Sequence, residues 1–463
     1  MTGRDGERRT QLWIALGIGA LTAVAYALLG WRQWEQLIAP SWDLGIFSQL
    51  AKAYSQFEAP IVPIKGHGFN LLGDHFHPIL ILLGPIWALW PSGLALLVTQ
   101  AVLFGVSAVP LARLAMERLG TAMGAALGIA YALGWGLQSA AEAQFHEIAF
   151  AVPILAFGLT AYLRGRFTAA ALWIGLLVFV KEDLGLTVAV FGAILALRKD
   201  QPDPDRRWRI GWMLVAWGLV WLLLATFVIL PALNPGGEYD YTGRLGSLWE
   251  IFVPIDKYVT VLMLVATAGV VGVRSPLILL MLPTLAWRFA GAVPFYWGWG
   301  WHYSAILMPI AAAALLDAMP GRRKNRWLAV GATVAVTLVL GARLPLAWLL
   351  VPDTWETSWR TPYAREAIDA VGQDASVETD ITLMAPLVSR ADVYWLGNGN
   401  PAPEYVLLDQ MGYVWKEGEA PTDAAVWAED RYPGTTYTTV YSEGGFHVAV
   451  REGGTDPGFD SAR

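Results

Sequence analysis

The pattern of apolar and polar positions divides the chain into two parts. Between Leu12 and Leu350, apolar stretches recur, and many are long enough to cross a hydrocarbon core of roughly 30 Å. From residue 351 onward the chain is polar, rich in turn residues and without a spanning run. The pattern therefore predicts a polytopic α-helical membrane domain over 1–350 and a separate domain over 351–463.

Basic residues between the apolar stretches predict how the spans are oriented. Arg8 and Arg9 precede the first span, and later basic clusters recur at every second turn. Because Lys and Arg are enriched in cytoplasmic loops, the N-terminus is expected in the cytoplasm and the C-terminal domain outside. About eleven spans are expected, at about 12–30, 93–112, 120–138, 147–163, 169–180, 184–197, 211–231, 258–273, 276–291, 304–318 and 327–350.

Residues 31–92 are predicted to form a long first outer loop. An amphipathic run, Leu44–Tyr54, lies within it. Residues 77–90 form an apolar stretch of only about 14 residues, which is short for a span, so we expect a helix along the membrane interface. Counting this stretch as a span would turn every later basic cluster outward, against the positive-inside tendency.

The polar tail predicts a small α/β domain on the outer surface. A helix is expected at Ala364–Val371, and Ser442–Gly445 carries the residues of a hairpin turn. The expected strands are Ser376–Thr379, Val393–Leu396, Tyr405–Leu408, Tyr437–Tyr441 and Phe446–Val450.

Composition agrees with a membrane protein and narrows its chemistry. Hydrophobic residues make up 56% of the chain and charged residues 15%, and cysteine is absent, so disulfides and thiolate sites are excluded. No phosphate-binding loop, Ser-His-Asp arrangement or zinc-finger spacing occurs, so ATP-driven transport, hydrolytic triads and nucleic-acid partners have no support.

Two aspartates of the first outer loop are candidate general bases. Asp43 follows the first span and precedes the amphipathic run, where partial desolvation can tune a carboxylate. The alternative is that Asp43 caps the helix that follows. Asp74 is the second candidate. With His75 and His77 it can also ligate a divalent metal, although residues two apart face the same way only on an extended strand.

Other ionisable residues gather on the same predicted side of the membrane. Ionisable side chains buried at membrane depth are costly, and they usually mark a functional site. His146 and Glu147 enter a span, and Glu147 can simply complement a helix dipole. Lys181, Glu182 and Asp183 stand between apolar stretches. Either these three neutralise one another, or Lys181 meets an anion such as a phosphate.

An aromatic, glycine-rich stretch, Pro294–Tyr303, also lies on this side. It is either an interfacial aromatic belt or a platform for a lipid or sugar. In the second case His302, Tyr303 and nearby Arg288 would supply polar contacts.

Several of these motifs, taken in order along nearly the whole chain, resemble the bacterial membrane family called domain of unknown function 2079. The tail segments Asp374–Val377 and Glu404–Asp409 are similar to the outer domain of that family. The motifs of the membrane part are Asp43-Leu44-Gly45-Ile46-Phe47, Asp74-His75-Phe76-His77-Pro78-Ile79, Phe145-His146-Glu147, Lys181-Glu182-Asp183-Leu184-Gly185 and His302-Tyr303-Ser304.

That family is similar in layout to the GT-C membrane glycosyltransferases, which carry an essential acid just after span one. The resemblance implies a GT-C-like bundle in a bacterial plasma membrane, with interfacial helices in the first outer loop. Asp43 matches the position of the acid, although the paired acids common in GT-C first loops are here a lone Asp43 followed by Leu44.

The resulting hypothesis is a glycosyltransferase that acts at the outer face of the bacterial plasma membrane. It would move a sugar from a polyprenyl-phosphate carrier to an envelope glycan, lipid or protein, with Asp43 as base. The substrate-binding residues would be His75, His146, Glu147, Lys181, Glu182, Asp183, Arg288, His302 and Tyr303. The alternatives are a transporter of a lipid-linked saccharide or small solute, and a non-catalytic envelope assembly protein.

Overall fold

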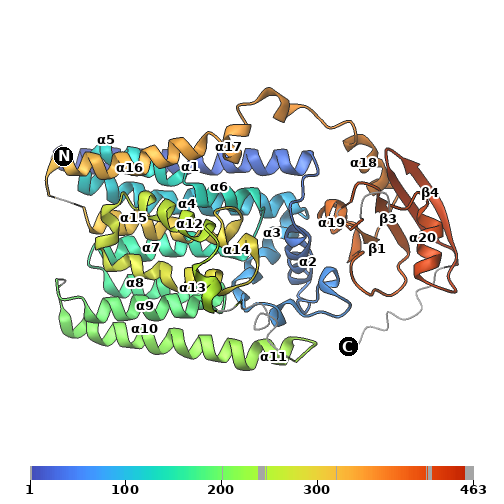
Figure 1. The fold of residues 1–463 in the computed structure, drawn as a ribbon, viewed down its shortest axis with the longest axis horizontal. Helices are drawn as coiled ribbons and strands as arrows, with labels where there is room; N and C mark the ends of the chain where they lie inside the picture. The colour runs from blue at the N-terminus through green and yellow to red at the C-terminus, as the bar shows by residue number, and fades with distance from the viewer. Residues whose placement is uncertain are drawn as a thin grey trace. The chain divides into compact units, whose positions relative to one another are not determined.

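The computed structural model divides by packing into two compact units (Figure 1). The helical unit comprises Met1–Trp31, Leu72–Leu80 and Leu97–Thr354, and the α/β unit comprises Arg32–Leu71, Ile81–Leu96 and Trp355–Arg463. Packing thus groups most of the first outer loop with the C-terminal residues. The residues described are 3–200, 202–237, 246, 248–319, 321–412, 414–415 and 420–453.

The helical unit has a helix at every position where a span is expected. Its α-helices are α1 (Gly3–Glu35), α4 (Gly93–Leu119), α5 (Thr121–Ala132), α6 (Trp135–Glu142), α7 (Ala151–Leu163), α8 (Phe167–Gly175), α9 (Leu184–Leu197), α10 (Pro204–Leu224), α11 (Leu230–Leu233), α12 (Asp256–Thr267), α13 (Leu282–Ala290), α14 (Pro294–Trp297), α15 (Leu307–Asp317), α16 (Arg323–Gly341) and α17 (Pro345–Trp348).

Short helical turns occur in both units. A π-helical turn, η6 (Ala225–Ile229), joins α10 to α11. The 3₁₀ turns are η1 (Pro63–Lys65), η2 (Leu71–Gly73), η3 (Pro78–Leu82), η4 (Glu147–Phe150), η5 (Leu176–Phe179), η8 (Leu248–Phe252), η9 (Val271–Arg274), η10 (Pro276–Met281), η11 (His302–Ser304) and η12 (Pro352–Trp355).

Few of the described helices could cross a membrane by length and composition. Three continuous helices qualify: Asp5–Glu35, Gly93–Leu119 and Pro204–Leu233. A fourth span is formed if the bent pair Pro294–Ser304 and Leu307–Asp317, which meet at 72°, is counted as one. The other apolar helices are shorter, so the number of eleven spans stays a prediction.

The expected span at 120–138 is broken. Helix α5 ends at Ala132, and α6 starts at Trp135 after Gly134, whose backbone is extended. A side chain at Gly134 would approach the carbonyl oxygen of Tyr131 to 2.8 Å, so the turn requires a glycine. The periodicity of the sequence does not reveal this break, because both flanking segments are apolar.

Helices α9 and α10 pack backbone to backbone through paired glycines. A Cβ atom at Gly192 would lie 2.5 Å from the carbonyl oxygen of Gly211, and one at Gly185 would lie 2.6 Å from that of Gly218. Small residues let helices approach closely in a membrane, where dispersion contacts replace the hydrophobic driving force. Figure 1 shows these two helices running side by side.

The α/β unit is built on a mixed five-stranded sheet of order β2-β1-β3-β5-β4. Strand β1 is parallel to β2 and β3, whereas β5 is antiparallel to β3 and β4. All five expected strands are confirmed, with small shifts at their ends. They are β1 (Ala375–Thr379), β2 (Ala391–Trp395), β3 (Tyr405–Asp409), β4 (Tyr437–Glu443) and β5 (Phe446–Arg451).

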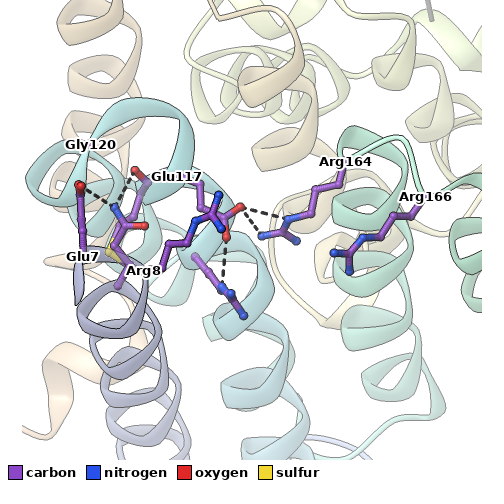
Figure 2. A pocket seen from close by; sticks show the side chains of 9 residues that line it. Glu7, Arg8, Glu117, Gly120, Arg164 and Arg166 are labelled. Carbon is purple, nitrogen blue, oxygen red and sulfur yellow. Dashed lines mark hydrogen bonds and ion pairs between the residues drawn. The ribbon is translucent and has the colours of Figure 1, made fainter. Parts of the chain in front are cut away.

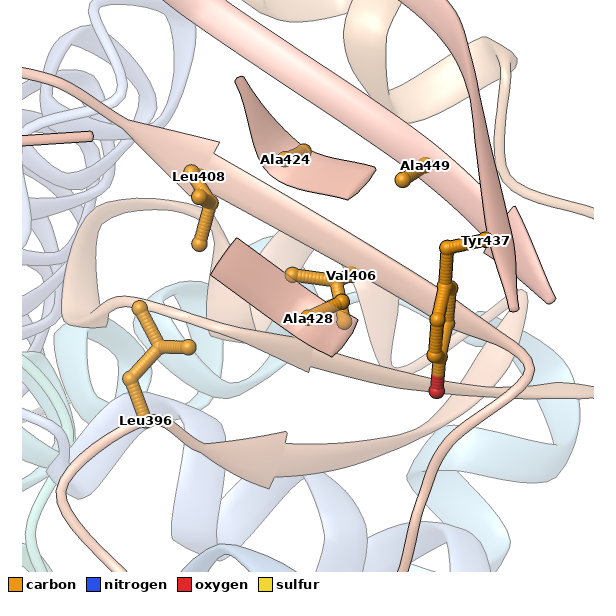
Figure 3. Packing of buried hydrophobic residues seen from close by; sticks show 7 residues of the cluster. All are labelled: Leu396, Val406, Leu408, Ala424, Ala428, Tyr437 and Ala449. Atoms are coloured by element: carbon orange, nitrogen blue, oxygen red, sulfur yellow. The ribbon is translucent and has the colours of Figure 1, made fainter. Parts of the chain in front are cut away.

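Helices cover this sheet and bury its apolar side chains. The expected helix at 364–371 is α18 (Thr361–Asp369), whereas α19 (Ile381–Leu387) and α20 (Ala424–Arg431) were not expected from the sequence. Helix α20 packs through Ala424 and Ala428 against strand residues that include Val406 and Leu408 (Figure 3). Its small residues let the helix lie close to the sheet.

Part of the first outer loop packs on the same unit. Helices α2 (Asp43–Ser55) and α3 (Leu83–Leu89) form there, consistent with the expected loop helices. The amide of Gln49 donates to the carbonyl of Val393 at 2.8 Å and accepts from the backbone N–H of Ile64 at 3.0 Å. Lys52 pairs with Asp392 at 3.2 Å. The loop is thereby attached to β2 through the buried Gln49 and the more exposed pair of Lys52 and Asp392.

The glycine contacts between α9 and α10 predict an unusual effect of a small substitution. Gly192→Ala should lower the free energy of unfolding by about 1–3 kcal/mol, because the new methyl group meets a backbone carbonyl that cannot move aside. Gly331→Ala on α16 is the matched control, since no atom lies within 4 Å of its Cβ position. The control should be neutral or slightly stabilising. Thermal unfolding in detergent measures both, and equal effects would contradict the prediction.

Candidate functional site

Two buried ion pairs join three segments of the helical unit. His75 lies between η2 and η3, Glu147 begins η4, and Lys181 and Glu182 lie between η5 and α9. The Nζ atom of Lys181 lies 2.8 Å from Oε1 of Glu147, and the Nδ1 atom of His75 lies 2.8 Å from Oε1 of Glu182. The sequence places these residues far apart, but the fold collects them in one cluster, which we call the buried charged cluster.

Glu182 is held on both of its oxygens. Its Oε2 atom accepts the backbone N–H of Phe76 at 3.1 Å, and its side chain is 1% exposed. Burial raises the pKa of Glu182, but His75 and Lys181 outweigh burial and the net pKa is lowered. Burial lowers the pKa of His75, but Glu182 outweighs burial and the net pKa is raised. Both shifts favour the charged form of the pair.

Lys181 and Glu182 each have a partner outside the Lys181-Glu182-Asp183 triplet. The side chain of Lys181 is 14% exposed and that of Glu147 only 3%. The structure therefore adds Glu147 to the groups that balance Lys181, an arrangement that neither sequence alternative contained. Burial raises the pKa of Asp183, the third member of the triplet.

Two histidines stack beside these ion pairs. The rings of His146 and His302 lie 3.6 Å apart at an interplanar angle of 24°. Gln100 of α4 orients the first of them by accepting the backbone N–H of His146 at 3.3 Å. Gln144 and Trp301, which shortly precede the two histidines, have φ angles of 72° and 62°. Such left-handed conformations are costly for residues other than glycine and concentrate at functional sites.

Arg288 holds the aromatic stretch Pro294–Tyr303 in place through hydrogen bonds to its backbone. It is fully buried, and its guanidinium donates to the carbonyl oxygens of Tyr296 at 2.7 Å and Gly298 at 2.6 Å. A further bond at 3.1 Å reaches the hydroxyl of Ser304, and the guanidinium lies 5.7 Å from the centre of the Tyr303 ring. These contacts make Arg288 a positioning residue for the segment that carries His302.

Two buried polar atoms near the ion pairs have no hydrogen-bond partner among the described residues. They are Nδ1 of His302 and Oδ1 of Asp183. The charge of Glu147 acts on His302, and the charge of Lys181 acts on both His302 and Asp183. Buried polar atoms are almost always hydrogen-bonded, so unmatched ones at a charged cluster point to a polar ligand.

The arrangement does not favour a metal centre. Within the part of the chain that the structure describes, no group of three or more His, Asp or Glu residues is arranged to hold a metal ion. This includes Asp74, His75 and His77. His75 pairs with Glu182 instead, and burial lowers the pKa of His77 to about 4, so it is neutral at neutral pH.

The two candidate bases belong to different units. Asp43 lies in the α/β unit, and Asp74 lies in the helical unit beside His75. Asp43 occupies the first turn of α2, whereas the capping position belongs to Trp42, which makes no side-chain cap bond. Asp43 thus lies one residue inside the helix, in the first turn, where a carboxylate complements the helix dipole.

The structure also reveals two buried polar residues that the sequence reading did not single out. Gln100 bonds the loop of His146, and Lys257 on α12 donates to the carbonyl of Phe289 at 2.9 Å and lies 4.5 Å from the Trp297 ring. Gln100 lies inside an apolar helix, which is a signal that could have been used. Lys257 lies near a helix start, where a lysine is ordinary.

These features define a polytopic helical membrane protein with a buried charged cluster and a mixed α/β unit. The chain belongs to the family described as predicted membrane protein (DUF2079), which matches residues 33–454. No curated protein matches the chain.

The fold is similar to that of a solved structure, ArnT from Cupriavidus metallidurans bound to undecaprenyl phosphate. The TM-score is 0.56 at 12% sequence identity, and the match covers 93% of this chain and 97% of that chain. This likeness shows that the two chains share a fold.

The Lys181–Glu147 pair predicts that a single substitution costs more stability than a paired one. Lys181→Met leaves the carboxylate of Glu147 buried without its cation, so it should cost roughly 3–5 kcal/mol of stability. Adding Glu147→Gln removes the uncompensated charge and should restore most of the loss. Thermal unfolding in detergent tests both variants, and a single variant as stable as the unmodified protein would contradict the pairing.

Proposed function

We propose that this protein is a GT-C-type glycosyltransferase that uses a polyprenyl-phosphate-linked sugar as donor. The observation that carries the proposal is the buried charged cluster with its two unmatched polar atoms, on Asp183 and His302. The shared fold with ArnT, whose structure holds undecaprenyl phosphate, supports a lipid phosphate as the ligand.

The proposed reaction transfers a glycosyl group to a hydroxyl of an envelope glycan, lipid or protein. The acceptor oxygen attacks the anomeric carbon while its proton passes to an aspartate carboxylate. The bond between the anomeric carbon and the phosphate oxygen breaks, and its electron pair leaves with the polyprenyl phosphate. A lipid-anchored carrier suits a site at the outer face of the plasma membrane, because the reaction then needs no soluble nucleotide sugar outside the cell.

The buried charged cluster is suited to stabilise the leaving phosphate. Lys181 is a compact cation that Glu147 holds in place at 2.8 Å, so little reorganisation is needed when negative charge develops. The unmatched Nδ1 atom of His302 is a further hydrogen-bonding group for that phosphate. Arg288 contributes by positioning the His302 segment, since its bonds are made to that segment.

The proposed base is Asp43, with Asp74 as the alternative. The position of Asp43 after the first span supports the first choice, because it matches the acid of the GT-C layout. The position of Asp74 next to His75 in the helical unit supports the second.

A second candidate function is transport of a lipid-linked saccharide or another solute. It is favoured by the pair Pro294–Ser304 and Leu307–Asp317, which is bent by 72°, with His302 immediately before the bend. Transporters often place their sites at broken helices. Movement of a lipid-linked sugar across proteoliposomes, with the glycosyl bond intact, would favour this function.

The role of Lys181 predicts the binding behaviour of two variants. The paired variant Lys181→Met, Glu147→Gln should be stable yet bind undecaprenyl phosphate at least about tenfold more weakly, whereas Lys181→Arg should retain part of the affinity because its charge remains. Binding is measured on the protein in nanodiscs by native mass spectrometry. Unchanged binding by the stable paired variant would remove Lys181 from the phosphate site.

Removal of the base predicts loss of transfer without loss of folding. In a deletion strain of the host, Asp43→Asn should fail to restore the missing envelope glycan, with a rate lower by about 10²-fold or more. Asp74→Asn is assayed beside it, and Asp353→Asn on η12 is the control at an exposed aspartate. Mass spectrometry of envelope glycans and lipid-linked sugars reports the outcome. Full activity of Asp43→Asn with loss in Asp74→Asn would transfer the role to Asp74.

A further inference from the structure

A polar cavity lies within the helical unit, at the end where α1 begins and α4 and α7 end. Its volume is about 540 Å³, within the range of roughly 300–1,000 Å³ that is typical of ligand pockets. Four arginines from three parts of the chain line it: Arg8, Arg113, Arg164 and Arg166.

This cavity is remote from the buried charged cluster. Gln100 and Glu147 belong to the cluster end of α4 and of the η4–α7 helix, and Glu117 and Arg164 belong to the other end of the same two helices. Each pair is separated by seventeen residues, which corresponds to about 25 Å along a helix. That distance is close to the thickness of a hydrocarbon core, so the cavity lies at the opposite membrane interface.

The carboxylates of this cavity are already engaged. Glu117 accepts from Arg113 at 3.1 Å on one oxygen and from Arg164 at 2.8 Å on the other. Glu7 accepts from the amide of Gln11 at 3.3 Å. Figure 2 shows Arg164 directed at Glu117 along these contacts.

The remaining two arginines leave positive charge unbalanced. The side chains of Arg8 and Arg166 have no hydrogen-bond or ion-pair partner among the described residues, yet both line the cavity. With four arginines against two glutamates, the lining carries an excess of two positive charges. A guanidinium offers a planar fork of donors that matches the oxygens of a phosphate.

We propose that this cavity binds a phosphate group carrying about two negative charges, with Arg8 and Arg166 as its direct ligands. Arg113 and Arg164 are held by Glu117 and supply the surrounding positive field. The chemistry fits the phosphate monoester of an anionic lipid headgroup from the adjacent leaflet, and also a soluble inorganic phosphate. Basic pockets between transmembrane helices on the cytoplasmic side bind the headgroups of anionic lipids.

The experiment uses the full chain and a pair of charge-matched double variants. Arg8→Gln, Arg166→Gln removes the two proposed ligands, and Arg322→Gln, Arg323→Gln removes two exposed arginines that do not line the cavity. Both change the net charge equally. Because Arg8 and Arg166 have no partners, the first variant should keep the melting temperature of the unmodified protein in plain detergent.

Native mass spectrometry from nanodiscs that contain phosphatidic acid measures retained lipid, and the melting temperature with added inorganic phosphate measures the soluble anion. The first variant should retain at least about tenfold less phosphatidic acid, or lose the phosphate-induced stabilisation, while the control variant behaves like the unmodified protein. Loss in the lipid arm alone identifies a headgroup, and loss in the inorganic phosphate arm alone identifies a soluble anion. Equal loss in both variants, or no loss in either arm, would overturn the proposal.

Discussion

The pairing of buried charge is the constraint on which the rest of the helical unit depends. Lys181, Glu182, Glu147 and His75 come from three regions of the chain and are largely buried. An unpaired ion in such surroundings costs several kcal/mol. Each of the three regions can therefore bury its charge only when the region that carries its partner is also in position. The adjacent residues Lys181 and Glu182 pair with two different segments, those of Glu147 and His75. One short connection between η5 and α9 therefore holds both of these segments.

Helix packing without a hydrophobic driving force supports that arrangement. Helix α9 starts directly after the Lys181-Glu182-Asp183 triplet, and the glycines Gly185 and Gly192 bring it into backbone contact with α10. Close approach maximises dispersion contacts, which are the main attraction between helices in lipid. The start of α9, and with it the triplet, is therefore held by a packed helix pair rather than by a free loop.

Polar groups lie at both ends of α4 and of the η4–α7 helix, but the two ends differ in how the charges are compensated. At one end the charges are paired, and the atoms without partners are single atoms of His302 and Asp183. At the other end two whole guanidinium groups are unpaired around a cavity. Burial explains the contrast, because a largely buried charge must be neutralised where it stands, whereas an exposed arginine remains stable in contact with water.

The sequence by itself determined the class of the protein, because hydrophobic length and basic loops reflect a bilayer that acts on each segment separately. It also placed the five strands, since a period of two and turn residues are local signals. Only the tertiary structure decided that Lys181 pairs with Glu147, that Gly134 interrupts a span, and that Gln100 supports His146. Those outcomes depend on which segments meet in space, and residues far apart in the chain carry no local record of their partners. For the same reason the sequence does not reveal that Asp43 and Asp74, both in the first outer loop, belong to different units.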